Sequence, residues 1–186
     1  MSLFGIFGKT REKEAARGLY GAVVERAREI AFYETAGVPD TVDGRFDMIA
    51  LHAFLVLRRL KRDHGATATL AQAFFDLMFV DMDENLREMG VGDLSVGPRV
   101  KQMAKAFYGR VAAYEKAMAE GPETLAVAVR RNLFRNADVD PATLAAMVGY
   151  MERQAAALDA QEIDVFLSGN VVLAPFSQLV EMENFR

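Results

Sequence analysis

The stretch FDMIALHAFLVLRRLKR, residues 46–62, carries the longest strongly apolar run of the chain, from residue 48 to residue 57. Its apolar residues recur at the spacing of a helical face: Phe46, Ile49, Ala53, Phe54, Leu57 and Leu60, with Leu51 and Val56 widening that face. A helix this apolar is normally central in the core of a globular protein. The run is about half of the ~20 residues that a membrane-spanning helix needs, so we expect this helix inside a soluble fold.

On both sides of this stretch, proline and glycine divide the sequence into blocks of helical length. We expect helices from Thr10 to about Tyr33, from Asp40 or Asp43 to about His64, from Thr69 to about Met89, from Pro98 to about Met118, from Pro122 to about Leu133, from Pro141 to about Leu158, and from Asp159 or Glu162 to Leu167. No alternating strand pattern or hairpin turn competes with these helices. The sequence therefore predicts an all-α fold, a single domain of about six or seven helices with an irregular C-terminal tail.

The chain has 186 residues, which is the length of one domain. We expect residues 1–9 to be a flexible apolar N-terminus, residues 10–170 to form the helical domain, and residues 171–186 to be a tail that is packed on the body or mobile. The first ten residues lack the basic region and the long apolar stretch of a secretory signal. We therefore expect a mature chain that begins near Met1 and is cytoplasmic.

Composition excludes several classes of protein. The chain has no cysteine, which excludes disulfides, thiolate catalysis and any zinc site that needs sulfur. Its formal net charge of −4 gives no general attraction to nucleic acid or to anionic lipid. We therefore expect no DNA partner, and any basic surface that binds a partner must be local.

The two histidines do not form a metal site by their spacing. His52 and His64 are twelve residues apart, which is about 18 Å along one helix. His52 lies in the most apolar helix and is interpreted as a hydrogen-bonded core residue. His64, next to Gly65, is interpreted as the end of that helix, where the dipole favours a cation.

No other pattern indicates a catalytic or cofactor-binding centre. Asp81, Asp83 and Glu84 form the densest acidic group, but they lack the loop and the central glycine of a calcium-binding EF-hand. A solvated acidic helix face is the simpler interpretation. The chain has no nucleophile elbow and no glycine-rich phosphate-binding loop. We therefore expect no catalytic, cofactor or metal site, and a protein that is not an enzyme.

Two basic clusters and the methionines leave alternatives open. Residues 58–62 contain four cations at the end of the most apolar helix, and a second cluster consists of Arg130, Arg131 and Arg135. Arginine stems can cover apolar surface at a helix end, or the clusters can dock ribosomal RNA, lipid headgroups or an acidic protein. Most of the ten methionines should fill the core, but methionine also suits adaptable binding surfaces, so a methionine-lined client groove is a further hypothesis.

The segment DMDENLREMGVGDLSVGPRVKQM, residues 81–103, resembles the signature of the ubiquinol–cytochrome c chaperone family. The resemblance continues into KAFYGR at residues 105–110, and the preceding RFDMIALH at 45–52 and LAQAFFD at 70–76 fit the same pattern. It covers roughly residues 12 to 170, with residues 81–110 as the specific part. The length and the order of these matches make chance an unconvincing explanation.

The resemblance implies a helical assembly chaperone that binds newly made cytochrome b and helps to build the cytochrome bc complex. We expect no presequence and no long N-terminal extension of the kind that mitochondrial members have, so the resemblance is to a bacterial member, in the cytoplasm or peripheral at the inner membrane. Mitochondrial members work with a small partner chaperone and near the ribosomal exit. Both contacts are left open for this chain.

A partner surface is expected around the glycine turn of the family signature. A holdase must combine apolar contact with charged residues that set orientation. The segment between residues 84 and 108 offers this mixture through Glu84, Arg87, Glu88, Asp93, Arg99, Lys101, Lys105 and Tyr108. Helical spacing places Lys101, Lys105 and Tyr108 on one side, away from the apolar face. The competing interpretation is that Asp93 and Arg99 only brace the turn and that the lysines keep the helix soluble.

Two other functions compete with the chaperone. The first is an adaptor that tethers ribosomes or membranes through the arginine clusters, with Leu3, Phe4, Ile6 and Phe7 as a short interfacial anchor. Its binding should weaken steeply with salt, whereas apolar client binding should not. The second is an enzyme that holds a metal ion at Asp81, Asp83 and Glu84.

Overall fold

The computed structural model of the chain describes residues 3–135 and 137–177, with side chains from Thr10 onward. These residues form eight α-helices and one π-helical turn, η1, and no strand. The elements in chain order are α1 (Leu3–Ala27), α2 (Ile30–Glu34), α3 (Val42–Arg62), α4 (His64–Glu88), α5 (Asp93–Glu120), α6 (Pro122–Val129), η1 (Arg130–Phe134), α7 (Pro141–Asp159) and α8 (Ile163–Leu167). The all-α fold predicted from the sequence is confirmed.

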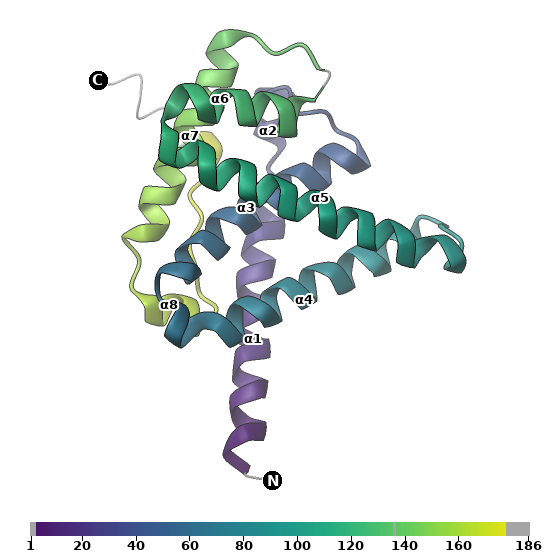
Figure 1. Cartoon of the computed structure of the whole chain (residues 1–186), viewed down its shortest axis with the longest axis vertical. Coiled ribbons are helices and arrows are strands. Elements are labelled where there is room, and N and C mark those ends of the chain that lie inside the picture. The colour runs from purple at the N-terminus through teal and green to yellow at the C-terminus, as the bar shows by residue number, and fades with distance from the viewer. Residues whose placement is uncertain (1–2, 136, 178–186) are drawn as a thin grey trace.

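Helix α3 lies at the centre of the molecule (Figure 1). It packs against α1, α4, α5, α7 and η1. Every residue from position 46 to position 56 is buried, including the polar Asp47 and His52. A helix surrounded on all sides needs an apolar surface all round, and this is the pattern that its sequence carries.

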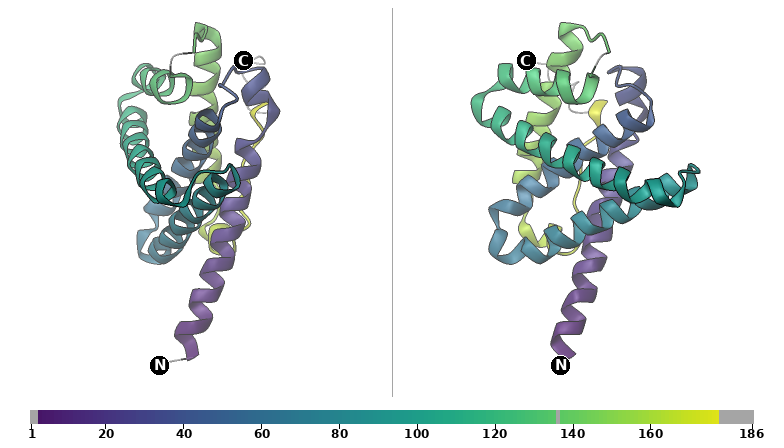
Figure 2. Two further views of the ribbon diagram at one scale, coloured as in Figure 1. Left: turned by 90° about the vertical axis from the view of Figure 1, so that its right-hand side faces the viewer. Right: turned by 45° about the vertical axis from the view of Figure 1, so that its right-hand side comes forward.

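Helices α4 and α5 form a hairpin that projects from the body (Figure 1). The connecting turn spans residues 89–92, and Gly90 has a φ of 79°, a backbone conformation that glycine adopts without strain. The two helices diverge from this turn toward the body, where α3 lies between them. Figure 2 shows α1 passing along the body and its first turns extending beyond it. Among the described residues, no helix has the length and hydrophobicity required to cross a membrane.

The described part of the C-terminal tail, residues 171–177, lies against α1 and α7; residues 171–175 have no regular secondary structure, and residues 176 and 177 are helical. Its Val171, Leu173 and Phe176 are buried. Side chains bind its backbone: the Gln161 amide pairs with both polar groups of Val172, and Glu29 accepts from the N–H of Phe176. A short irregular segment without a neighbouring strand is thereby supplied with hydrogen-bond partners. Residues 178–186 lie outside the described part of the chain.

The first predicted helix differs from the observed one at both ends. Helix α1 begins at Leu3 rather than at Thr10, because extending an existing helix is much easier than starting one and no proline interrupts residues 3–10. It ends at Ala27, and the chain resumes as the short helix α2. The break lies at Glu29. Its carboxylate binds Arg26 of α1 and the backbone N–H of Phe176 in the C-terminal tail. The expected flexibility of residues 1–9 stays a prediction.

The junction between α3 and α4 is tighter than predicted. A single residue, Asp63, separates the two helices, so His64 opens α4 instead of ending α3, and the expected cap at Thr69 lies inside α4. The buried hydroxyl of Thr67 donates to the carbonyl of Leu60 at 2.6 Å, which satisfies one of the last carbonyls of α3. This local bond makes a longer loop unnecessary.

Helix α5 begins at Asp93, five residues before the expected start at Pro98. Proline lacks the N–H that would bind the carbonyl of Leu94. Leu94 is 96% exposed, so water can satisfy that carbonyl. The proline is therefore tolerated within the exposed first turns of the helix.

Candidate functional site

A groove of about 960 Å³ lies between the α4–α5 hairpin and the segment that runs from the end of α1 to the start of α3. Its floor is apolar. Phe46 and Ile49 of α3 and Met82 and Leu86 of α4 are buried there. The groove exists because α4 and α5 diverge from their turn, which leaves a hollow between them and the body.

Two large apolar side chains form the lips of the groove. Met89, at the end of α4, is 51% exposed, and Val42, at the start of α3, is 56% exposed. On α5 the half-buried Met103 lines the same hollow. Three methionines, including Met82, therefore surround the groove, and their unbranched side chains can adapt to different apolar partners.

The rim of the groove is charged and predominantly basic. The cations that line it are Arg28, Arg45, Arg99, Arg110 and Arg135, and the anions are Asp40, Asp43 and Asp81. Arg45 binds Asp40 at 2.6 Å, and both side chains are largely exposed. Exposed pairs of this kind contribute little to stability, so Arg45 and Asp40 are available to set orientation and discrimination.

A buried carboxylate underlies one end of the groove. Asp47 is fully buried on α3, and its two oxygens bind Arg110 of α5 and Nε of Arg135, which follows η1, each at 2.6 Å. Arg135 also reaches Asp43 at 2.9 Å. Burial raises the pKa of Asp47, while the two guanidiniums act in the opposite direction. These contacts hold α3, α5 and η1 together at the end of the groove.

Arg135 has a φ of 54°, and among the described residues it is the one non-glycine residue with a positive φ. It follows the π-helical turn η1, whose wider winding redirects the chain. An L-residue persists in this conformation only when its surroundings hold it there, and here the bonds to Asp43 and Asp47 do so.

The eight residues predicted as a partner surface are all exposed on the hairpin, and the structure divides them. Arg99 lines the groove. Arg87 binds both Asp83 and Asp93, so it braces the turn between the two helices. Those that do not line the groove are Glu84, Arg87, Glu88, Asp93, Lys101, Lys105 and Tyr108. Arg99 is therefore the one residue of the predicted partner surface that also lines the groove.

The outer face of the hairpin carries an aromatic cluster. Tyr108 is 58% exposed, and its ring lies 5.3 Å from that of Phe75, measured between centroids. Phe75 in turn lies 4.7 Å from Phe79. Contacts of this kind stabilise the pairing of α4 with α5. The side of α5 that carries Lys101 and Lys105 is thus a second, separate surface of the hairpin.

Sequence reasoning missed most of the groove, although it singled out methionine as a residue type. Met82, Leu86 and Met89 recur at helical spacing on α4, and Met103 and Arg110 do so on α5. The helical spacing of these residues is visible in the sequence. However, residues that face the core of a protein have the same spacing, so the sequence does not separate the two. Only the divergence of the two helices shows which part of the stripe is left without a packing partner.

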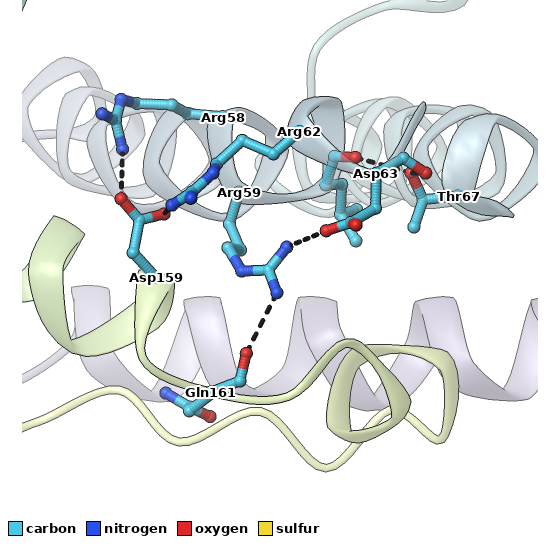
Figure 3. Close-up of polar contacts among 8 residues, drawn as sticks. Arg58, Arg59, Arg62, Asp63, Thr67, Asp159 and Gln161 are labelled. Carbon is cyan, nitrogen blue, oxygen red and sulfur yellow. Dashed lines mark hydrogen bonds and ion pairs between the residues drawn. The ribbon is translucent and has the colours of Figure 1, made fainter. Parts of the chain in front are cut away.

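The first basic cluster is engaged within the molecule (Figure 3). Arg58 and Arg62 both bind Asp159 at the end of α7. Arg59 is 7% exposed, donates to Asp63 and to the carbonyl of Gln161, and lies over the ring of Phe166. Lys61 binds Glu115 of α5 at 2.8 Å. This cluster fastens the end of α3 to its neighbours.

His52 is a core histidine, as predicted. It is fully buried, its Nδ1 lies 2.8 Å from the carbonyl of Met48, and its Nε2 lies 2.7 Å from the hydroxyl of Tyr150. The carbonyl can only accept, so Nδ1 carries the proton and Nε2 accepts from the tyrosine. Desolvation lowers the pKa of His52 to about 4.

The acidic group on α4 takes part in structural contacts. Asp81 accepts a hydrogen bond of 2.7 Å from the hydroxyl of Tyr20 on α1, and Asp83 binds Arg87. In the described ranges, no three side chains of histidine, cysteine, aspartate or glutamate are grouped so that they could hold a metal ion.

Comparison with known proteins gives a consistent picture. The family described as ubiquinol-cytochrome C chaperone matches residues 34–173. A Xenopus laevis protein named ubiquinol-cytochrome-c reductase complex assembly factor 1 is 28% identical over 170 residues, which cover 91% of this chain and 85% of the relative. The mouse and human proteins of that name are each 26% identical over 91% of this chain, which spans 58% and 57% of their lengths.

A solved structure is similar over nearly the whole chain. The crystal structure of the Cbp3 homolog from Brucella abortus superposes with a TM-score of 0.81 at 32% sequence identity. The match covers 95% of this chain and 99% of that one. The arrangement of helices around α3 is therefore shared with an experimental structure.

Proposed function

The chain belongs to the ubiquinol-cytochrome C chaperone family, and from this we propose that it assists assembly of the ubiquinol–cytochrome c reductase complex by holding newly made cytochrome b. The names of the frog, mouse and human relatives support the complex as the target. The choice of cytochrome b comes from the resemblance, and the groove supports the holding of an apolar client.

The observation that carries this proposal is the groove with its exposed apolar lips. Met89 and Val42 leave more than half of their surfaces in water, although both line the hollow. Exposed apolar surface beside a hollow is typical of a binding site. Covering it with an apolar segment gains about 25 cal/mol for each Å² removed from water.

The basic rim suits reversible binding of such a segment. Arg28 and Arg99 stand on opposite walls of the groove, and neither forms an ion pair with another residue of the described chain. Charges at a rim influence encounter and orientation more than affinity. A client can therefore be held by apolar contact and released when its own partners cover the same surface.

We further propose that the chain works without catalytic turnover. The groups that suggested chemistry have other tasks: His52 bonds within the core, Asp81 binds Tyr20, and Asp83 braces the hairpin turn. The proposed place of action is the cytoplasmic face of the inner membrane, where a membrane-protein client would be met during insertion. A small partner chaperone and ribosome contact are not part of this proposal.

The adaptor function has weaker support. It relied on the arginine clusters, but Arg58, Arg59 and Arg62 bind acidic or carbonyl groups of this chain. Docking RNA or lipid would have to compete with those bonds. The other part of that hypothesis, the anchor at Leu3, Phe4, Ile6 and Phe7, lies outside the residues whose side chains are described.

The test is capture of cytochrome b by the tagged chain from respiring cells, with a matched pair of variants. Val42→Asp places a charge on the lip of the groove, whereas Val127→Asp places one on α6, where valine is 68% exposed and lines no part of the groove. We expect the first to reduce recovery of cytochrome b about tenfold and the second to leave it unchanged, with equal melting temperatures. Equal recovery by both variants would remove the groove from the proposal.

The outer face of the hairpin is tested in the same assay. The double variant Lys101→Glu with Lys105→Glu reverses two charges without touching the groove. If this face also binds the client, recovery of cytochrome b falls while the melting curve stays normal. Full recovery by this variant, together with loss by Val42→Asp, would assign client binding to the groove alone.

A further inference from the structure

The methionines of the described chain differ sharply in exposure. Met48, Met78, Met147 and Met151 are fully buried, Met82 is 6% exposed, Met103 and Met118 are half-buried, and Met89 is 51% exposed. The chain has no cysteine, so thioethers are its only sulfur groups. Oxidation of methionine follows exposure. Among the methionines with described side chains, Met89 is therefore the one that a small oxidant reaches first.

Met89 also lines the groove, as Met82 and Met103 do, and it is the most exposed of the three. It ends α4 directly before Gly90, whose positive φ turns the chain toward α5, and it forms the lip of the hollow. Met118, which is half-buried on the same hairpin, does not line the groove. Of the three methionines that line the groove, Met82 is buried and Met103 is half-buried, so Met89 combines this position with the greatest exposure.

We propose that Met89 is a reversible oxidation site that switches off the groove, an inference that rests on the proposed client-binding function. The oxidant is a peroxide. One oxygen of the peroxide is transferred to the thioether sulfur, the O–O bond breaks, an S–O bond forms, and water leaves when the oxidant is hydrogen peroxide. Sulfur is oxidised by two electrons and peroxide is reduced by two. Methionine sulfoxide reductases reverse the change.

The physical effect is a change of polarity at the lip. A thioether is a soft apolar group, whereas a sulfoxide carries a strong dipole and accepts hydrogen bonds. An apolar client seated on the lip would cover that oxygen without offering it a donor. Burial of an unpaired polar group is costly enough to weaken binding by at least about fivefold. The folded core is unaffected, because the lip is outside it.

The experiment treats the purified chain with dilute hydrogen peroxide and follows two quantities. Peptide mapping by mass spectrometry gives the sulfoxide fraction at each methionine. Binding is measured with detergent-solubilised cytochrome b lacking haem and, separately, with the apolar dye bis-ANS. Wild type is compared with Met89→Leu, which keeps an apolar lip that cannot be oxidised, and with Met118→Leu as the matched control. Each preparation is compared with its own untreated sample.

We expect Met89 to be oxidised before the other methionines between residues 10 and 177, and peroxide to weaken cytochrome b binding at least about fivefold in wild type and in Met118→Leu. In Met89→Leu, cytochrome b binding after peroxide should equal binding before it. In the wild type, a methionine sulfoxide reductase should restore the binding that peroxide removed. Oxidation spread evenly over the methionines, or equal losses in all three proteins, would overturn the inference. If untreated wild type does not bind cytochrome b, the proposed function fails, and the peptide map with the dye still decides whether oxidation of Met89 changes the groove.

Discussion

His52 couples the stability of the fold to pH through a single buried base. Its pKa is lowered to about 4, mainly because burial disfavours the charged imidazolium. The unfolded chain takes up a proton near the ordinary pKa of ~6.5, whereas the folded chain does not. Stability is therefore full above about pH 6.5 and falls as the pH is lowered toward 4, by about 3 kcal/mol in total.

The loss of stability between pH 6.5 and pH 4 can be traced to His52 by substitution. Replacing His52 by Gln should remove most of the loss of unfolding free energy between pH 6.5 and pH 4, because the unfolded state no longer gains that proton. The measurement is urea denaturation at several pH values. His64→Gln serves as the control, since it changes the only other histidine and should keep the wild-type slope. A slope that survives in His52→Gln would assign the pH dependence to other groups.

The arginines of one cluster should differ widely in their contribution to stability. Arg59 is nearly buried and has three partners, whereas the Arg62 side chain is 57% exposed and shares Asp159 with Arg58. We expect Arg59→Ala to lower the free energy of unfolding by about 2–3 kcal/mol, because it loses two charged hydrogen bonds and a ring contact. Arg62→Ala should cost less than about 1 kcal/mol.

Thermal and urea unfolding of the two variants decide the point. Similar losses would mean that the contacts drawn in Figure 3 do not determine the stability of this junction.

At the scale of elements, the docking of α1 depends on the absence of a side chain. A Cβ at Gly18 would come within 2.3 Å of the carbonyl oxygen of Gly169, in the turn after α8. Backbone meets backbone there, so nothing flexible can move aside. Gly21, one turn further along α1, faces open space. Two glycines of the same helix thus have opposite roles.

The corresponding prediction uses both positions. Gly18→Ala should destabilise the chain by about 1–3 kcal/mol, because α1 must shift away from the turn after α8. Gly21→Ala should stabilise it by about 0.5–1 kcal/mol through helix propensity alone. Denaturant midpoints measured side by side give the sign of each effect. Stabilisation by both substitutions would show that the close approach at Gly18 is relieved at no cost.

At the scale of the whole molecule, the body and the hairpin should differ in local stability. The body is centred on the fully buried part of α3, while the hairpin turn at residues 89–94 has exposed backbone and few neighbours. Opening of a region costs little where few apolar contacts are lost. A groove formed by a stable body and a more mobile hairpin could adjust its width to a client.

Hydrogen exchange followed by mass spectrometry tests this difference. Peptides covering residues 89–94 should exchange within seconds, while those covering residues 48–56 should exchange only through global unfolding. Addition of cytochrome b should slow exchange in α4 next to the groove and leave α6 unchanged. Uniform protection of hairpin and body in the free chain would contradict the prediction.

The helical class, the central place of the stretch at residues 46–62 and the buried role of His52 could be predicted from the amino-acid sequence, because the periodicity and polarity of a segment are local properties. The family signature at residues 81–110 was legible for the same reason. Helix boundaries at residues 63 and 93 were displaced, since a hydroxyl bond from Thr67 and the solvation of Leu94 depend on neighbours that local rules do not weigh.

The position of the groove could not be predicted from the sequence, because it depends on how distant helices pack. The angle between α4 and α5 leaves part of an apolar stripe without a packing partner, and no pattern along one helix encodes that angle. The same holds for the pairing of Asp47 with Arg110 and Arg135, which come from segments 63 and 88 residues away along the chain. The role of an apolar helix face or of a charged residue depends on the residues that pack opposite to it. Those neighbours are set by the packing of helices that are distant in the sequence.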